Sequence, residues 1–261
     1  MFDWQILTKL ESKTGYWFAN ANISAVAGGD INQAFCVLSN GKKVFVKQNK
    51  LALDNVLAEE EKGLLEIAKC LKESAPKIIL QSTTNKSTFL ALEWIDTGNK
   101  TNLFRPDLGK NVAQHHKNSY SQFGFHRNNY IGSLKQTNTW SSSWATFFIE
   151  HRLEPQIKLA YDANLISHKH KSKFQKLFIE LDLIFPSEKP ALLHGDLWSG
   201  NVMCNSKGFP ILIDPATYYG HREMDLAFTQ MFGGFSYIFY ETYFSLHPVV
   251  QGFSERVPIY N

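Results

Sequence analysis

The chain has 261 residues, 44% hydrophobic and 20% charged, which is the balance of a folded globular protein. The formal net charge of +3 is too small to indicate a nucleic-acid partner. No run approaches the roughly 18 apolar residues of a membrane helix, and the first residues lack a signal-peptide pattern. Three scattered cysteines form no zinc-ligand spacing. We therefore expect a cytoplasmic protein, long enough for two lobes, with neither nucleic acid nor membrane as partner.

The first hundred residues are expected to mix strands and helices. Asn40-Gly41, between two apolar runs, is a strong hairpin signal. The patterns in chain order are a helix over 3–14, three strands (the first ending at Val26, then 34–38 and 43–48), a helix over 54–71, and a hairpin of 77–80 with 87–95.

Glycines and a lysine in this region indicate a nucleotide site by their order. Gly28-Gly29 alone is more often a plain turn, and Lys47 alone is more often a solvated strand lysine. A glycine-bearing hairpin, then a strand lysine, then an acidic helix is typical of the nucleotide lobe of a kinase-like fold. One glutamate among residues 59–61 is expected to pair with Lys47, and the others to be solvated.

A strand that ends in Glu93-Trp94-Ile95-Asp96 fits a hinge between two lobes. We expect an adenine ring to bond to backbone groups near Glu93 and Ile95 at such an interface. An ordinary strand end is the alternative interpretation.

The rest of the chain is expected to be mostly helical. His115-His116 has no partner ligands in the pattern and is expected to lie on the surface or at the edge of the core. Pro155 is a candidate kink. The basic run over 168–173 is expected to be a solvated helix face. The expected helices cover 108–117, 144–164, 168–185, a segment ending near 232, and 237–246, with a long functional loop over 119–140.

The strongest chemical pattern is His194-Gly195-Asp196, followed by Asn201 and then Asp214. Short apolar runs precede both aspartates, so they are expected at strand ends. Phosphoryl transfer needs one Asp on the attacking hydroxyl, and an Asn with a second Asp to hold Mg²⁺. Asp196 is the expected base, and His194 is expected to be structural. A metal hydrolase using His194, Asp196 and Asp214 is an alternative, but it leaves Lys47 unexplained.

The acceptor is expected to be small. Asp225 follows Asp214 by only 11 positions, which leaves no room for the activation loop and Ala-Pro-Glu segment of a peptide kinase. Trp198, Tyr218 and Tyr219 are candidates for stacking on a sugar ring. Few acids surround His221-Arg222, which weakly disfavours a polycationic aminoglycoside.

These stretches resemble the fructosamine kinases (ketosamine 3-kinases), which are similar to aminoglycoside phosphotransferases and share a protein-kinase-like fold. The similarity covers nearly the whole chain. The stretches that carry it are Gly28-Gly29-x-Ile31-Asn32, Val44-Phe45-Val46-Lys47, Glu60-x-x-Gly63-Leu64, Leu92-Glu93, Asn129-Tyr130-Ile131-Gly132 with Gln136-x-Asn138-x-Trp140, Trp144-x-x-Phe147-Phe148-x-x-x-Arg152-Leu153, His194-Gly195-Asp196-Leu197-Trp198-Ser199-Gly200-Asn201, and Ile213-Asp214-Pro215-Ala216 through His221-Arg222-Glu223-x-Asp225-Leu226-Ala227.

The resemblance implies an α+β bilobal fold. Residues 1–96 would form the nucleotide-binding lobe, with an antiparallel sheet and one main helix, and 97–261 a mostly helical catalytic lobe. Relatives continue through a further helical segment, so an apolar groove near 237–246 is expected to be exposed or covered by a partner.

The resemblance also implies roles for single residues. Lys47, paired with Glu60, would hold the ATP phosphates, Asp196 would be the base, and Asn201 with Asp214 would bind Mg²⁺. Asp225 would brace the catalytic loop. The nucleotide site would include Gly28, Gly29, Asn32, Glu93 and Ile95, and the substrate site Trp198 and His221.

The implied reaction is ATP-dependent phosphorylation of the sugar 3-hydroxyl of ketosamines, the sugar adducts of amines and protein lysines, as a step in deglycation. Another small-molecule kinase, of aminoglycoside or choline type, and an inactive nucleotide-binding module are the alternatives.

Overall fold

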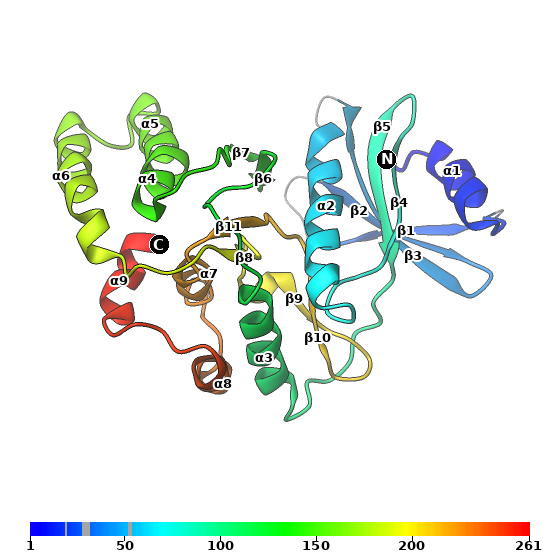
Figure 1. Cartoon of the computed structure of the whole chain (residues 1–261). Coiled ribbons are helices and arrows are strands. Elements are labelled where there is room, and N and C mark those ends of the chain that lie inside the picture. The colour runs from blue at the N-terminus through cyan, green and yellow to red at the C-terminus, as the bar shows by residue number, and fades with distance from the viewer. Residues whose placement is uncertain (19, 28–31, 52–53) are drawn as a thin grey trace. The chain divides into compact units, whose positions relative to one another are not determined.

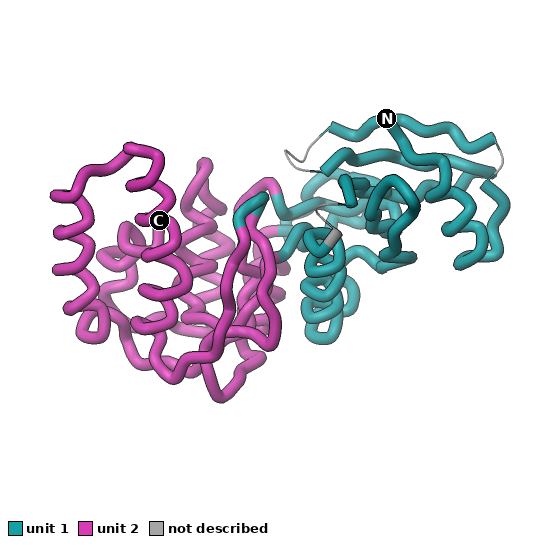
Figure 2. Tube along the Cα trace, turned by 90° about the horizontal axis from the view of Figure 1, so that it is seen from above, with its two compact units in different colours: residues 1–104, 132–134, 201–215 teal, residues 105–131, 135–200, 216–261 magenta. Residues whose placement is uncertain are grey.

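The computed structural model describes residues 1–18, 20–27, 32–51 and 54–261. Contacts divide them into two units, which Figure 2 colours separately. Unit 1 comprises residues 1–104, 132–134 and 201–215, and unit 2 comprises residues 105–131, 135–200 and 216–261. These units do not follow the lobe boundary expected at residue 96. The segment 201–215, for example, packs with the N-terminal residues. In the described part of the chain, no helix is both long and apolar enough to cross a membrane.

Unit 1 is built on a five-stranded antiparallel sheet with the strand order β1-β2-β3-β5-β4. Asn40 and Gly41 both take positive φ between β2 and β3, so the predicted hairpin is confirmed. The strands are β1 (Asn22–Val26), β2 (Gln33–Ser39), β3 (Lys42–Lys50), β4 (Ile78–Thr83) and β5 (Ser87–Glu93).

Two helices lie against this sheet (Figure 1): α1 (Gln5–Thr14) and α2 (Asp54–Cys70). Alternate residues of a strand point to opposite faces. Val44 and Val46 of β3 join a core cluster with Ile6 and Leu10 of α1. Lys47, the next residue along β3, therefore points to the opposite face, where it meets α2.

Unit 2 is mostly helical, with short paired strands. Strand β8 (Ala191–Leu193) pairs antiparallel with β11 (Tyr218–Gly220). The expected loop over 119–140 instead contains two short strands of one sheet, β6 (Asn129–Ile131) and β7 (Leu134–Gln136). The helices are α3 (Phe104–His116, mostly in unit 2), α4 (Trp144–Phe148), η2 (Ile149–Leu153), α5 (Glu154–Asp162), α6 (His168–Ile184), α7 (Glu223–Phe228), α8 (Tyr237–Leu246) and α9 (Phe253–Tyr260).

Pro155 interrupts the helix that the sequence predicts over 144–164. The five residues of η2 are π-helical and end just before the proline, which lies in the first turn of α5. Proline has no backbone N–H, so it cannot continue the hydrogen bonding of a regular α-helix but fits a first turn. The single predicted helix is thus a succession of three.

His115 gives unit 2 a predicted sensitivity to acid. The side chain is buried, and burial together with the neighbouring His116 lowers the pKa of His115 to about 3 from an ordinary value of 6.5. As the pH falls below 6.5, the unfolded chain binds a proton that the folded chain excludes, so stability is lost toward pH 3 at up to about 1.4 kcal/mol per pH unit. His115→Leu is expected to make this slope shallower in urea unfolding at pH 5–6.5. An unchanged slope would contradict the assignment.

Candidate active site

Lys47 lies between two carboxylates of unit 1. Its Nζ is 2.8 Å from Glu60 Oε1, and it also contacts Asp214 Oδ1. The side chains of Lys47 and Glu60 are each only 10% exposed. Burial alone would lower the pKa of Lys47, but Glu60 and Asp214 outweigh it and raise that pKa. Lys47 therefore carries a permanent positive charge in a poorly solvated position, which suits an anionic ligand.

Glu60, rather than its neighbours, meets Lys47. Glu59 pairs with Lys62 instead. The spacing explains this, because Glu60 lies three residues after buried Leu57 and four before buried Leu64, on the inward stripe of α2. Burial raises the pKa of Glu60 to about 7, with Asp214 adding to the effect and Lys47 opposing it.

The other residues predicted for the nucleotide site also belong to unit 1, and the structure describes only some of them. Gly28 and Gly29 lie outside the described residues. Asn32 accepts a hydrogen bond from Asn49 Nδ2 at 2.6 Å, and Asn49 shares the Lys47 face of β3 because it lies two residues further on. The Glu93 amide donates to the Lys77 carbonyl at 2.9 Å, so an adenine at 93–95 would have to use other backbone groups.

A hairpin brings Asn201 and Asp214 together. Strand β9 (Val202–Cys204) starts directly after Asn201, and β10 (Pro210–Leu212) ends two residues before Asp214. The strands pair antiparallel, and the Ile213 amide donates to the Asn201 carbonyl at 3.0 Å. Asp214 itself takes a φ of 56°, an uncommon left-handed conformation for a residue other than glycine. Residues 13 positions apart thus meet at the open end of one hairpin.

The side chains of Asn201 and Asp214 suit Mg²⁺ better than a transition metal. Both offer oxygen ligands, and the Asp214 side chain is 36% exposed. Among the described residues no group of three or more His, Cys, Asp and Glu has metal-site geometry. Mg²⁺ typically takes one or two carboxylates and completes its shell with water and substrate phosphates. A hydrolase centre built on His194, Asp196 and Asp214 gains no support from this finding.

The loop that carries Asp196 begins directly after β8 in unit 2. Gly195 has a φ of 83°, and a Cβ on it would lie 2.1 Å from the Ala216 carbonyl oxygen, so only glycine fits. His194 is buried, and its Nδ1 lies 3.3 Å from the Asp196 amide. His194 is therefore structural, as predicted, and Asp196 is half-buried at the head of the loop.

Asp225 holds this loop by its backbone. Its carboxylate accepts the amides of His194 at 2.7 Å and Gly195 at 2.9 Å, so the predicted bracing role is confirmed. His116 Nε2 lies 3.1 Å from the same carboxylate, and His116 Nδ1 lies 2.8 Å from the Tyr243 hydroxyl. Burial alone would raise the pKa of Asp225, but the contacts with His116, the nearby His194 ring and the Gly195 amide outweigh burial and lower that pKa.

His116 is a positioning residue that the sequence interpretation missed. It was expected on the surface or at the core edge, but both His115 and His116 are buried. The signal was available: His116 follows Leu108 and Val112 at helical spacing on the buried stripe of α3.

The prediction that His221 contacts the substrate is wrong. The side chain has no exposed surface and lies among aromatic rings, with Nε2 3.1 Å from the Pro186 carbonyl oxygen. Tyr218, a candidate for sugar stacking, is also buried, against Phe147 and Arg152. Tyr219 is half-buried, and Trp198 is half-buried within the loop.

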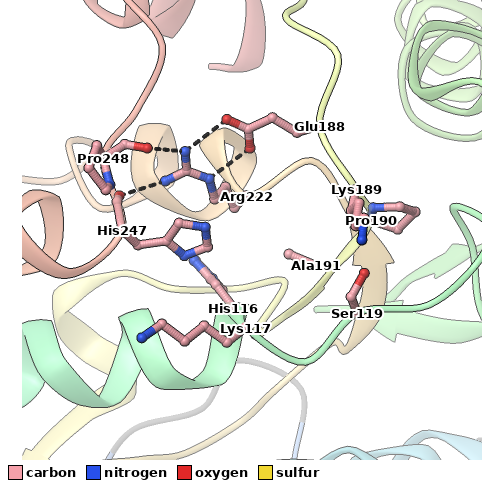
Figure 3. Close-up of a pocket in the computed structure, with 10 residues that line it drawn as sticks. All are labelled: His116, Lys117, Ser119, Glu188, Lys189, Pro190, Ala191, Arg222, His247 and Pro248. Atoms are coloured by element: carbon pink, nitrogen blue, oxygen red, sulfur yellow. Dashed lines mark hydrogen bonds and ion pairs between the residues drawn. The ribbon is translucent and has the colours of Figure 1, made fainter.

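Arg222 and Glu223, which follow His221, are structural too. Figure 3 shows the Arg222 guanidinium between the Glu188 carboxylate and the carbonyls of His247 and Pro248. Its Nε and Nη2 lie 2.7 and 2.8 Å from the two Glu188 oxygens. Glu223 pairs with Arg256. The His-Arg-Glu motif thus fixes the start of α7, the helix that carries Asp225. The cavity beside Arg222, of about 420 Å³, is lined by none of the predicted site residues that the structure describes.

Replacing Lys47 is expected to affect both binding and stability. Lys47→Met leaves Glu60 buried without its partner, which costs about 3 kcal/mol of unfolding free energy. The loss should be smaller at pH 6 than at pH 8, because the raised pKa of Glu60 lets it bind a proton at the lower pH. Turnover should fall ~10²-fold through loss of phosphate stabilisation.

The stability prediction is tested by urea unfolding at pH 6 and pH 8, and the turnover prediction by initial rates of ADP release. The double variant Lys47→Met/Glu60→Gln should regain stability but not activity. The control Lys62→Met removes a lysine that is 40% exposed and should change little. Equal stability losses at pH 6 and pH 8 would count against a buried, unpaired Glu60.

The five-stranded sheet with its buried lysine–glutamate pair, and the loop held by Asp225, define a phosphotransferase of the kinase-like fold. The similarities of the chain agree with this class. The structure of an aminoglycoside-3′-phosphotransferase of type VIII matches with a TM-score of 0.56 over 97% of this chain and 96% of that one, at 16% identity, which concerns the fold alone.

The chain belongs to the fructosamine kinase family, whose model matches residues 3–261. It is 36% identical over 244 residues to a probable ketoamine kinase from Enterococcus faecium, covering 92% of this chain and 86% of the relative. A protein-ribulosamine 3-kinase from Oryza sativa is 34% identical, over 91% of this chain and 70% of that one. A Haemophilus somnus protein of known structure, provisionally named fructosamine-3-kinase, matches with a TM-score of 0.90 and 26% identity, over 98% and 86% of the two chains.

Proposed function

We propose that this protein transfers the γ-phosphoryl group of ATP to the 3-hydroxyl of a ketosamine, the adduct of a sugar with an amine or a protein lysine. The observation that carries the proposal is the buried Lys47 held between Glu60 and Asp214 in unit 1. The ketoamine and ribulosamine kinases among the relatives support this choice of acceptor.

The nucleotide side of the reaction belongs to unit 1. Lys47 binds α- and β-phosphate oxygens, and Glu60 keeps its ammonium in place. Asn201 and Asp214 are the residues that would hold Mg²⁺, which supplies positive charge against the phosphates. Asp214 contacts Lys47 in this structure, so its carboxylate would be shared between Lys47 and Mg²⁺.

The acceptor side belongs to unit 2. Asp196 takes the proton of the sugar 3-hydroxyl, whose oxygen forms a bond to the γ-phosphorus while the bond to the ADP oxygen breaks. Asp225 keeps the loop backbone of Asp196 fixed, and Trp198 contacts the acceptor. The 3-phosphate makes the adduct labile, so the free amine is released, which is the chemistry of deglycation.

The direct test is Mg²⁺-dependent ADP release with four acceptors: ribulosyl-lysine, fructosyl-lysine, kanamycin and choline. We expect turnover on at least one of the two ketoamines and none on kanamycin or choline. Turnover on kanamycin or choline alone would replace the proposal with another small-molecule kinase. ATP binding without turnover on any acceptor would indicate an inactive nucleotide-binding module.

A further inference from the structure

Phe232 in unit 2 combines three features that packing alone does not explain. It is a large apolar residue with 66% of its surface exposed. Its φ is 53°, in the left-handed region that bulky side chains rarely adopt. Its ring lies edge-on to Trp198 of the catalytic loop, with ring centroids 5.4 Å apart and an angle of 64° between the planes.

The local backbone shows why phenylalanine is an unfavourable choice here. The Gly234 amide donates to the Met231 carbonyl at 3.1 Å, which closes a four-residue turn with Phe232 and Gly233 at its centre. Both central residues have positive φ, 53° and 98°, as in a type I′ turn. Such positions favour Asn, Asp and Gly. Strain of this kind clusters at functional sites, where it is retained for the side chain it presents.

The partner ring is also held in place. A Cβ on Gly200 would lie 2.3 Å from the Trp198 ring, so this glycine makes room for the indole. The Trp198 backbone amide donates to the Asp196 carbonyl at 3.2 Å, so the backbones of Trp198 and of the residue proposed as base are in direct contact. Phe232 packs against Phe228 as well, at the end of α7, the helix that holds the loop through Asp225. One segment, residues 223–234, thus positions both the loop backbone and Phe232.

We infer that Phe232 and Trp198 form a specificity site for the amine end of the substrate; this rests on the function proposed above. A ketosamine carries a secondary ammonium one carbon from its carbonyl group, close to the hydroxyl that is phosphorylated. Two inclined aromatic rings attract such a cation through their faces and exclude water from it. A free ketose or its ether lacks the cation and gains only apolar contact. The pair therefore selects a cationic sugar–amine adduct over the neutral sugar.

The test compares a protonated N-alkyl ketosamine with the neutral 1-O-alkyl ether of the same ketose. Phe232→Leu keeps apolar bulk but removes the ring. It is expected to lower kcat/KM for the ketosamine ~10-fold, mainly through KM, and for the ether by less than ~3-fold. Trp17→Leu, which removes an aromatic residue of unit 1 that is 70% exposed, should change neither value.

A second variant separates function from folding. Phe232→Asn suits the turn, so it is expected to raise Tm by about 2 °C or more while losing at least as much kcat/KM for the ketosamine as Phe232→Leu. Wild-type kcat/KM in Phe232→Asn would overturn the inference. Equal losses for ketosamine and ether in Phe232→Leu would overturn it too, because the ring would then recognise shape rather than charge.

Titration calorimetry with the same two compounds keeps this test apart from the test of turnover. Ketosamine binding that weakens in Phe232→Leu, without turnover by the wild type, supports the aromatic site and overturns the catalytic proposal. Turnover by the wild type that is insensitive to Phe232 overturns only the aromatic site. Absence of ketosamine binding to the wild type overturns both.

Discussion

Asp196→Asn is expected to lower kcat by ~10²-fold or more while ATP still binds, because an amide of the same shape cannot accept the proton of the sugar hydroxyl. The Asp196 amide approaches His194 Nδ1, and its carbonyl accepts the Trp198 amide. Asparagine keeps both backbone contacts and the shape of the side chain, so the loop should keep its conformation. The proposed nucleotide-binding residues Lys47, Asn201 and Asp214 belong to unit 1 and are unchanged.

The measurement is steady-state ADP release together with an ATP-binding titration. Asp162→Asn is a matched control, since this carboxylate is 56% exposed and forms an ion pair with the exposed Lys158. A kcat within ~3-fold of wild type would remove Asp196 from the role of general base. Loss of ATP binding along with kcat would point to a structural defect instead.

Replacing Asp225 is expected to lower both stability and turnover. The side chain is 1% exposed and accepts from His194 N, Gly195 N and His116 Nε2. Asp225→Asn turns one acceptor into a donor facing a donor, and it removes the negative charge. The expected cost is about 3 kcal/mol of unfolding free energy. Because Asp225 then no longer holds the loop backbone in position, kcat should also fall ~10²-fold in protein that remains folded.

Urea unfolding measures the loss of stability. The loss of kcat is measured at urea concentrations below the unfolding midpoint, where the variant is folded. His116→Gln should show a smaller loss of both, because its amide can still donate to Asp225, whereas His116→Leu should approach Asp225→Asn. A stability loss below about 1 kcal/mol in Asp225→Asn would contradict the bracing role. A kcat that stays normal in a destabilised Asp225→Asn would restrict Asp225 to folding.

Sequence patterns predicted what depends on neighbours along the chain. Strand alternation separates Val46 from Lys47, and helical spacing places Glu60 on the stripe of Leu57 and Leu64. Asn40-Gly41 predicted its own turn, in which both residues take positive φ. The bracing role of Asp225 was predicted from the family resemblance, and its contacts with the loop amides confirm it.

The wrong predictions concern the burial of polar side chains, which cannot be predicted from the residues next to them in the sequence. His221 and Tyr218 follow Asp214 in a segment that looks like a polar loop, yet both lie in the core of unit 2. The same holds for His116, whose two ring nitrogens are satisfied by Asp225 and Tyr243, 109 and 127 positions further along the chain. A polar ring can be buried when such distant partners satisfy it, and a linear pattern does not show those partners.

The sequence by itself predicted the turn at Asn40-Gly41, an acidic helix with a glutamate for Lys47, and the motif that carries Asp196, since these follow from turn chemistry, periodicity and short spacing. The family, its bilobal fold and the choice of Glu60 among three glutamates came from the resemblance of the sequence to the fructosamine kinases. Only the tertiary structure decided that His116, Tyr218 and His221 are buried, and that the segment 201–215 packs in unit 1. It alone also shows Phe232 exposed, with a positive φ, beside Trp198. The physical reason is that burial, and the partners that make burial tolerable, come from segments that meet only when the chain folds.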